Sequence, residues 1–336
     1  MVAESLNTLQ RLGYFATLAT NFNNQAGVNT DALAAVVLPL GQPDHRANLL
    51  GALDAARAAR DAGLAAADTA LDGLDAFILG ELGLTLPPPQ PIEPYAIRLG
   101  DMSEGRFDPF VNKPWYAKLL SALSDAAVPN RALGTLVQSV VGGATPSRND
   151  DSLYTKDGIA LLRINNIAPN ELKLDDCRYI TEAVHEGDLG RSQLRRNDVL
   201  MTITGRVGTT AVYDRDEPAN INQHLVRLRL NDGTNPFYLA AFLNSGFGLA
   251  VSNRSVTGAT RVALDYNSIR ALPIPILALS EQAAIAAEVD RRRADARRLR
   301  ADARAGWAAA RQAFEDALLG PPPPPAAVPL PVPGRN

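Results

Sequence analysis

Residues 36–53 read VVLPLGQPDHRANLLGAL, and residues 272–289 read LPIPILALSEQAAIAAEV. Both stretches contain a proline-bearing apolar run that leads into an apolar helical pattern. The two stretches are equivalent at a fixed separation along the chain. At about the same separation, Leu6-Asn7 corresponds to Leu243-Asn244, and Leu82-Gly83 corresponds to Leu319-Gly320. A repeat of such long period indicates a duplicated supersecondary unit. The stretch between the copies is itself the size of a domain, so the repeat predicts two equivalent units separated by a domain.

Each copy continues into a long predicted helix. Apolar residues recur at three- and four-residue steps over residues 43–83 and again over residues 280–319, a near-heptad pattern. Each helix would be roughly 60 Å long. One face of each is apolar, so neither is stable as a single exposed rod. We therefore predict that the helices pack antiparallel, with Leu71, Leu74 and Ile78 facing the other helix.

The region between the helices changes character. Residues 84–94 (LTLPPPQPIEP) form a proline-rich, non-helical linker. Residues 131–277 contain short β-rich runs separated by Gly, Asn and Asp, which is typical of a mixed α/β domain and gives the fold class α+β. The predicted strands are Leu161–Ile167, Val199–Ile203, Thr209–Tyr213 and Leu225–Leu230.

Bulk properties exclude several classes of protein. A net charge of −3 over 336 residues argues against a free-standing polycationic nucleic-acid coat protein. Cys177 is the single cysteine, so neither an internal disulfide nor a thiolate metal cluster is expected. The three histidines are scattered without metal-ligand spacing. No signal peptide and no apolar run of about 18 residues stands out, which predicts a cytoplasmic protein with no membrane partner.

An ordered series of short segments carries a family resemblance. The segments are Gly142–Arg148, Leu162–Ile167, Asn197–Gly205, Asn220–His224, Phe237–Ser245, Thr257–Arg261, Leu272–Pro275 and Ser280–Gln282. In this order and spacing they resemble the target recognition domain of Type I restriction–modification specificity subunits. The long helices are similar to the two spacer regions of that family, and the resemblance covers residues 1–319.

The resemblance implies a division of the chain. Family members usually carry two complete recognition domains, and this chain corresponds to one that is truncated in its first target recognition domain. The implied parts are a remnant of that first domain (1–40), a first spacer helix (41–86), a proline-rich linker and lead-in segment (87–130), a target recognition domain (131–277), a second spacer helix (278–319) and a disordered proline-rich tail (320–336).

The resemblance also implies a function. The chain would be a non-catalytic DNA sequence-recognition subunit, directing other subunits to a bipartite site on double-stranded DNA. Its partners would be methyltransferase (modification) subunits, a restriction subunit, and either a second copy of the chain or a second specificity chain. No cofactor is expected in this chain, since S-adenosylmethionine would be bound by the methyltransferase subunits.

Residues 131–277 supply side chains suited to DNA recognition. Arg pairs with guanine and Asn or Gln with adenine in the major groove, while hydroxyls and cations hold phosphates. The neighbouring glycines would let the backbone approach DNA closely. The candidate DNA-binding residues are Thr145, Ser147, Arg148, Arg163, Asn165, Thr204, Arg206, Asn222, Gln223, His224, Thr260 and Arg261.

Several of these patterns also fit ordinary structural roles. Arg163 and Asn165-Asn166 fit a solvated strand face, and Thr202 and Thr204 fit ordinary strand positions. Residues 222–224 fit a turn held by side-chain-to-backbone bonds. The basic run 291–304 fits a solvated helix face or an acidic partner as well as DNA.

Two other functions compete with DNA recognition. Asn235-Pro236-Phe237-Tyr238 differs by one residue from the Asn-Pro-Pro-aromatic loop with which adenine-N6 DNA methyltransferases hold a flipped base. No glycine-rich nucleotide-binding turn accompanies it. The other competitor is a coiled-coil scaffold of another anti-phage complex, whose middle domain binds no DNA.

Overall fold

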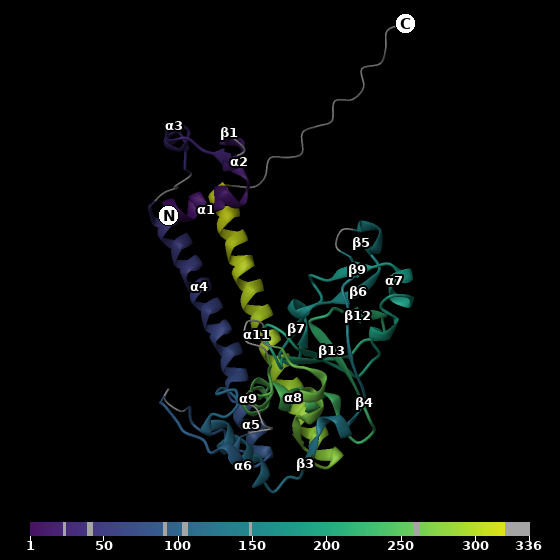
Figure 1. Cartoon of the computed structure of the whole chain (residues 1–336). Helices are drawn as coiled ribbons and strands as arrows, with labels where there is room; N and C mark the ends of the chain where they lie inside the picture. The colour runs from purple at the N-terminus through teal and green to yellow at the C-terminus, as the bar shows by residue number, and fades with distance from the viewer. Residues whose placement is uncertain are drawn as a thin grey trace. The chain divides into compact units, whose positions relative to one another are not determined.

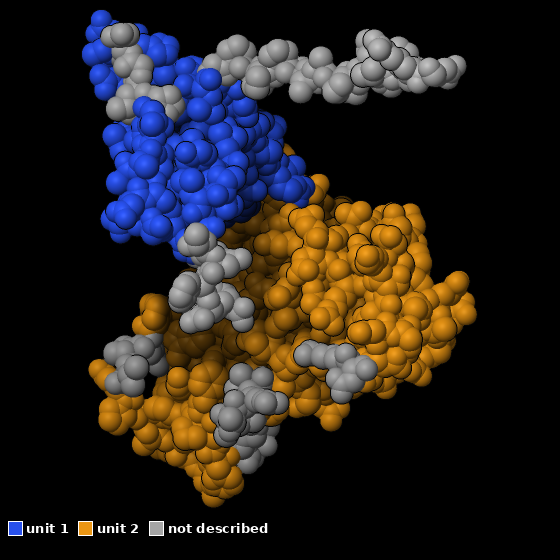
Figure 2. Space-filling view, turned by 90° about the horizontal axis from the view of Figure 1, so that it is seen from above, with its two compact units in different colours: residues 1–71, 294–336 blue, residues 72–293 orange. Residues whose placement is uncertain are grey.

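The computed structural model describes residues 1–22, 25–38, 43–89, 93–102, 107–147, 150–257 and 263–319. The chain divides into two compact units, which are coloured separately in Figure 2. Unit 1 comprises residues 1–71 and 294–336, and unit 2 comprises residues 72–293. The predicted tail 320–336 lies outside the described residues. In the described ranges, no helix is long and apolar enough to cross a membrane.

Unit 1 is built on two antiparallel helical segments (Figure 1). They are α4 (Pro43–Asp72) and the C-terminal part of α11 (Leu279–Leu319). A Cβ on Gly63 would lie 2.9 Å from the Cβ of Ala303, and Asp68 pairs with Arg300 at 2.7 Å. Later residues of α4 therefore contact earlier residues of α11, as expected for antiparallel helices. The predicted antiparallel packing is confirmed for this unit.

The N-terminal residues pack on the same helices. Two ion pairs attach α1 (Val2–Arg11) to them, Arg11 with Glu315 at 2.5 Å and Glu4 with Arg57 at 2.7 Å. The chain continues through α2 (Tyr14–Leu18), the hairpin of β1 (Thr20–Phe22) and β2 (Gln25–Gly27), and α3 (Thr30–Ala34).

The sequence repeat is reproduced in the element boundaries. The helix α4 begins at Pro43 and α11 at Leu279, which are equivalent positions. The short helices α3 and α10 (Tyr266–Ala271) are also equivalent, and each has a side-chain N-cap. The cap is Asn29 in α3 and Asp265 in α10. The apolar run Val36–Leu40 differs from its counterpart: residues 36–38 form no strand and 39–40 lie outside the described residues, whereas Pro273–Pro275 form β14.

The prediction of one uninterrupted helix over residues 43–83 is wrong. The helix α4 ends at Asp72, and α5 (Leu74–Glu81) begins after Gly73. Glycine lowers helix stability and leaves room for a close neighbour. Here that neighbour is Arg292, whose Nη1 would lie 3.3 Å from a Cβ on Gly73 and whose guanidinium carbon is 5.0 Å from the centre of the Phe77 ring.

The apolar stripe of the first long helical stretch packs as predicted only in part. Ile78 is buried, and Leu74 is half-buried against the same core of unit 2. Ile285 and Val289 of α11 belong to that core too. Leu71, the third residue expected at the helix pair, is half-buried.

An antiparallel four-stranded sheet forms the centre of unit 2. Three of its strands coincide with predicted ones, because their apolar runs are bounded by turn residues. The fourth, β4, was not predicted. In spatial order the strands are β11 (Thr210–Tyr213), β10 (Asp198–Thr202), β13 (Leu225–Leu230) and β4 (Val137–Gly142).

This sheet is the middle layer of unit 2, covered on both faces. Side chains alternate across a strand, so neighbouring residues enter different cores. Val199 and Met201 pack toward helices, and Leu200 packs toward a second sheet. The helices are α5, α6 (Pro114–Ser124), α8 (Pro236–Asn244), α9 (Gly246–Arg254) and the start of α11; the second sheet is β12 (Ala219–Ile221), β6 (Ile159–Leu162), β9 (Arg178–Ile180) and β5 (Tyr154–Thr155).

Smaller elements complete unit 2. The strand β3 (Asn130–Ala132) pairs with β14, and β7 (Ile167–Ala168) forms a hairpin with β8 (Glu171–Leu172). A short helix, α7 (Glu182–Glu186), follows β9. The predicted strand Leu161–Ile167 is wrong beyond Leu162, because the chain turns there into a 3-10 helix, Ile164–Asn166.

Candidate nucleic-acid interface

Backbone hydrogen bonds bring the predicted site segments together at the ends of β6, β10 and β12. The N–H of Asn222 donates to the carbonyl of Leu162 at 3.0 Å. The N–H of Ile203 donates to the carbonyl of His224, and the carbonyl of Ile203 accepts from Leu264, both at 3.0 Å. We call the segments 143–147, 163–167, 203–208 and 222–224 the loop cluster.

Four predicted residues form one continuous hydrogen-bond chain in this cluster. The hydroxyl of Thr145 donates to Oε1 of Gln223, and Nε2 of Gln223 lies 3.2 Å from Nε2 of His224. Nδ1 of His224 lies 2.8 Å from Oγ1 of Thr204. Because the amide nitrogen of Gln223 can only donate, Nε2 of His224 must accept. The ring proton of His224 is therefore assigned to Nδ1, which donates it to Oγ1 of Thr204. The Thr204 hydroxyl is then left with its own proton to donate.

Two glycines allow the close backbone crossings of the cluster. A Cβ on Gly143 would lie 1.9 Å from the carbonyl oxygen of Ile221, a contact that no side chain permits. A Cβ on Gly142 would lie 2.0 Å from the hydroxyl of Tyr266. The sequence predicted that the glycines here let DNA approach the backbone, whereas Gly143 admits the carbonyl of Ile221 instead. Nothing in the sequence indicated Tyr266, which lies more than a hundred residues away along the chain.

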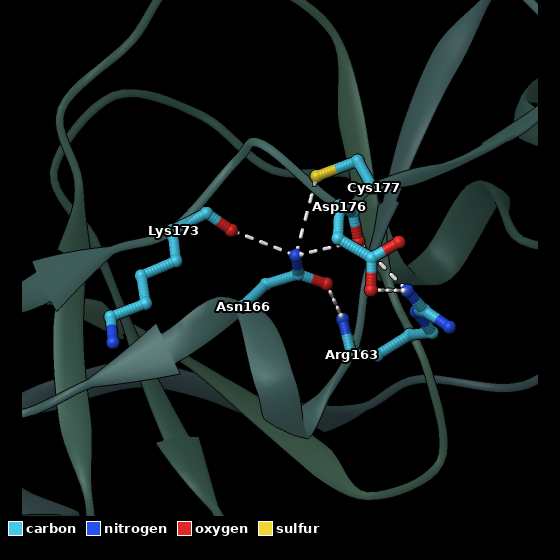
Figure 3. A network of polar contacts seen from close by, with 5 residues as sticks. All are labelled: Arg163, Asn166, Lys173, Asp176 and Cys177. Atoms are coloured by element: carbon cyan, nitrogen blue, oxygen red, sulfur yellow. Dashed lines mark hydrogen bonds and ion pairs between the residues drawn. The ribbon is translucent and has the colours of Figure 1, made fainter. Parts of the chain in front are cut away.

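Asn166 holds the 163–167 segment from inside (Figure 3). Its Oδ1 accepts from the N–H of Arg163 at 2.8 Å, and its Nδ2 donates to the carbonyls of Lys173 and Asp176 at 2.8 and 3.2 Å. The residue is 1% exposed and lies in a 3-10 helix, so the interpretation as a solvated strand face at Asn166 is wrong. Arg163 donates through Nη2 to the backbone carbonyl and the carboxylate of Asp176. A buried carboxamide must satisfy its polar atoms, which explains why the expected strand ends here.

Cys177 lies at the edge of the same network. Its sulfur is 3.5 Å from Nδ2 of Asn166. Burial raises the pKa of the thiol, Arg163 opposes this shift, and Asp176 and Asp175 add to it. The thiol therefore stays protonated at neutral pH and acts as a small apolar group.

Arg206 joins the 203–208 segment to the 3-10 helix Ile164–Asn166. Its Nη2 donates to the carbonyls of Ile164 and Ile167 at 3.1 and 3.0 Å. Gly205, at a φ of +67°, is packed so closely that a Cβ would lie 2.9 Å from Cδ1 of Ile164. At least part of the guanidinium predicted to read a base thus serves to fix a neighbouring loop.

The remaining predicted residues differ in exposure. Asn222 is buried and accepts from the N–H of His224 at 3.1 Å, which is the turn arrangement that the sequence left open. Thr202 is buried and donates to the carbonyl of Arg206, as an ordinary strand residue can. Ser147 and Asn165 are exposed.

Three predicted residues, Arg148, Thr260 and Arg261, lie outside the described residues. The described residues next to the last two are close to the loop cluster. Thr257 and Ala263 exchange two backbone hydrogen bonds of 2.9 Å, and Ala263 lies opposite Thr204 in an isolated bridge.

The basic run of α11 is largely paired within each unit. In unit 2, Arg291 and Arg292 both donate to Glu288, and Arg293 pairs with Glu171. The two arginines hold the pKa of Glu288 at about 2. In unit 1, Arg298 and Arg300 pair with Asp295 and Asp68. This pattern favours the interpretation as an ion-paired helix face, although Arg293 is largely buried in its pair with Glu171.

The segment that resembled a methyltransferase loop is a helix start. Oδ1 of Asn235 accepts from the N–H groups of Phe237 and Tyr238, so Asn235 is the N-cap of α8. Tyr238 is fully buried, and its hydroxyl donates to the carbonyl of Pro275 at 2.7 Å. A carboxamide and an aromatic ring that are used in this way cannot also hold a flipped base.

Comparison with known proteins points to the same family as the sequence motifs. No protein-family model matches the chain. A stretch of 136 residues, 40% of this chain, is 27% identical to the specificity subunit of the Type I restriction enzyme EcoBI of Escherichia coli. That stretch spans 28% of the relative's length.

Two solved structures from Type I restriction–modification systems resemble the fold of almost the whole chain. A chain from the structure of a type I R-M system matches 94% of this chain and 69% of its own length, with a TM-score of 0.55 and 17% identity. The S subunit of the M. genitalium Type I restriction-modification system matches 94% of this chain and 71% of its own length, with a TM-score of 0.50 and 9% identity. The fold is that of a Type I specificity subunit. The predicted α+β class and the predicted family resemblance are confirmed.

Proposed function

We propose that this chain is the non-catalytic subunit that reads the DNA sequence in a Type I restriction–modification complex. The observation that carries the proposal is the loop cluster, where residues far apart in the sequence form one hydrogen-bonded polar surface in a fold of the specificity-subunit kind. Residues 131–277 would be the target recognition domain. Residues 41–86 and 278–319 would be spacer helices, preceded by part of a first recognition domain (1–40) and joined through the lead-in segment (87–130).

The loop cluster has the chemistry of a DNA-reading surface. Thr145 and Thr204 offer hydroxyls, and Gly205 is exposed and lacks a side chain, so a phosphate can approach the backbone there. Asn165 and Gln223 are exposed carboxamides, the group that pairs with adenine in the major groove. Arg148, Thr260 and Arg261, which the sequence also predicts, lie outside the described residues.

A subunit that only recognises DNA would need partner subunits to carry out methylation and cleavage. Methyltransferase subunits would dock on the spacer helices and bring S-adenosylmethionine, and a restriction subunit would join them. The complex would act on chromosomal and invading DNA in the cytoplasm. The rival function of an adenine-N6 methyltransferase loses its motivating motif, because Asn235 and Tyr238 have structural roles.

The test is reconstitution of the full chain with methyltransferase subunits, followed by mapping of methylated positions in random-sequence DNA. We expect methylation at one defined target with the complex, and no methyl transfer by this chain alone. The double variant Thr204→Val, His224→Ala should reduce methylation of that target. Arg196→Ala, which breaks an exposed ion pair with Asp216, serves as the matched control and should leave it unchanged.

Two outcomes would contradict the proposal. Methyl transfer by the purified chain alone would make it an enzyme. A complex that assembles but modifies no defined sequence, with or without the double variant, would favour the scaffold function instead.

A further inference from the structure

The exposed and buried carboxamides of the loop cluster are used differently. Asn166 is buried with its amide bonded to backbone carbonyls, and Asn222 is buried and bonded to its own turn. Gln223 is exposed, but its Oε1 accepts from Thr145 and its Nε2 contacts His224. Asn165 is exposed, and its side chain makes no hydrogen bond to any described residue. Of these four carboxamides, Asn165 is the one whose donor and acceptor both remain available.

The backbone beneath Asn165 is held on both sides. Asn166 ties the end of the 3-10 helix to residues 163, 173 and 176 through three hydrogen bonds (Figure 3). Arg206 bonds the carbonyls on either side of Asn165 and Asn166, those of Ile164 and Ile167. A short helix that is clamped in this way presents its outward residue in one backbone conformation, which lowers the entropy lost on binding.

Resting on the proposed DNA recognition, we infer that Asn165 reads an adenine in the major groove of the target. An asparagine carboxamide matches adenine because its oxygen accepts from the N6 amino group while its nitrogen donates to N7. Guanine offers two acceptors at that edge and cytosine one donor, so neither satisfies both atoms. Asn166 and Arg206 are positioning residues, which act on the DNA through the backbone of residue 165.

The experiment selects preferred sequences from a randomised double-stranded DNA library with the full chain in its reconstituted complex. Wild type should enrich one sequence with an adenine at a position that Asn165→Ala makes indifferent, with about tenfold lost at that position. Asn165→Asp should move the preference there to cytosine, because a carboxylate accepts from the cytosine N4 amino group. Asn7→Asp adds the same charge at an exposed asparagine of α1 and should change nothing at that position.

The positioning role has its own readout. Arg206→Ala should blur the preference at the same position as Asn165→Ala, and the double variant should lose no more preference there than Asn165→Ala alone. Circular dichroism of each variant separates this effect from misfolding. An Arg206→Ala chain that folds and blurs a different position would overturn the assignment.

The outcomes separate the inference from the proposed function. If wild type enriches no sequence, DNA recognition itself is wrong, and the inference falls with it. If wild type enriches a sequence but Asn165→Ala and Asn165→Asp enrich the same one with equal strength, DNA recognition stands and Asn165 does not read the base.

Discussion

The carboxylate of Asp198 in β10 accepts two hydrogen bonds from Arg229 in the neighbouring strand β13. Nε donates at 2.8 Å and Nη2 at 2.7 Å. Asp198 is 1% exposed and also accepts from the N–H of Arg195 at 2.8 Å. The same bidentate geometry occurs between Arg196 and Asp216, at 2.7 Å for both bonds, where both side chains are at least half exposed. The two pairs share this geometry and differ strongly in burial, so they form a natural comparison for the central sheet that carries the loop cluster.

Arg229→Ala should lower the free energy of unfolding by about 3 kcal/mol, because it leaves the Asp198 charge buried without its partner. Arg196→Ala should give no measurable change, since water and salt already screen the exposed pair. Urea unfolding followed by circular dichroism measures both. Equal effects of the two substitutions would show that burial does not govern the strength of these pairs.

Gly143→Ala should destabilise unit 2 by about 1–3 kcal/mol, because the new methyl group would collide with the carbonyl oxygen of Ile221. To relieve this collision the 143–147 segment would move, which would separate Thr145 from Gln223. The preference of the complex for its DNA sequence should weaken as well. Gly51→Ala is the matched control, since nothing lies within 4 Å of a Cβ there and the residue is in the interior of α4. That substitution should raise stability by up to about 1 kcal/mol. Thermal unfolding and DNA selection on both variants test the expectation.

Glu288 should contribute a pH dependence to the folded chain. Its pKa is lowered from 4.5 to about 2 by hydrogen bonds from Arg291 and Arg292. A group with a lowered folded pKa stabilises the fold above its unfolded pKa and loses that effect as the pH falls through the folded value. Stability should therefore fall between pH 4.5 and about 2 more steeply in wild type than in Glu288→Gln. Equal slopes, or a Glu288 carboxyl signal that titrates near 4.5 by NMR, would contradict this.

Much of the fold could be predicted because its signals are local. The apolar run Leu225–Leu230 between turn residues became β13 with those bounds, and the repeat placed the starts of α4 and α11 at equivalent positions. The break at Gly73 could not be predicted from the local pattern, and the side chain that packs beside it, Arg292, lies more than two hundred residues later. The strand β4 was missed for a similar reason: Val137–Gly142 ends in glycine, and it is stabilised by pairing with β13.

The candidate site was harder to predict than the fold, because the type of a residue does not reveal which groups its side chain will contact. Asn165 and Asn166 are adjacent and identical in type, yet one is exposed and the other holds a turn. The difference depends on the carbonyls of Lys173 and Asp176, which the turn brings within reach. Thr145 and Gln223 were both predicted, but their direct contact depends on the crossing at Gly143.

The described residues contain one loop cluster per copy of the chain, and this number should determine the symmetry of the DNA target. If the reconstituted complex holds two copies, its target should be two inverted copies of one half-sequence, because target symmetry follows protein symmetry. If it holds one copy and a second specificity chain, the two half-sequences should differ. Native mass spectrometry gives the stoichiometry, and methylation mapping gives the target. A complex with a single copy and no other specificity chain that still modifies two different half-sequences would exclude the idea that each loop cluster reads one half-site.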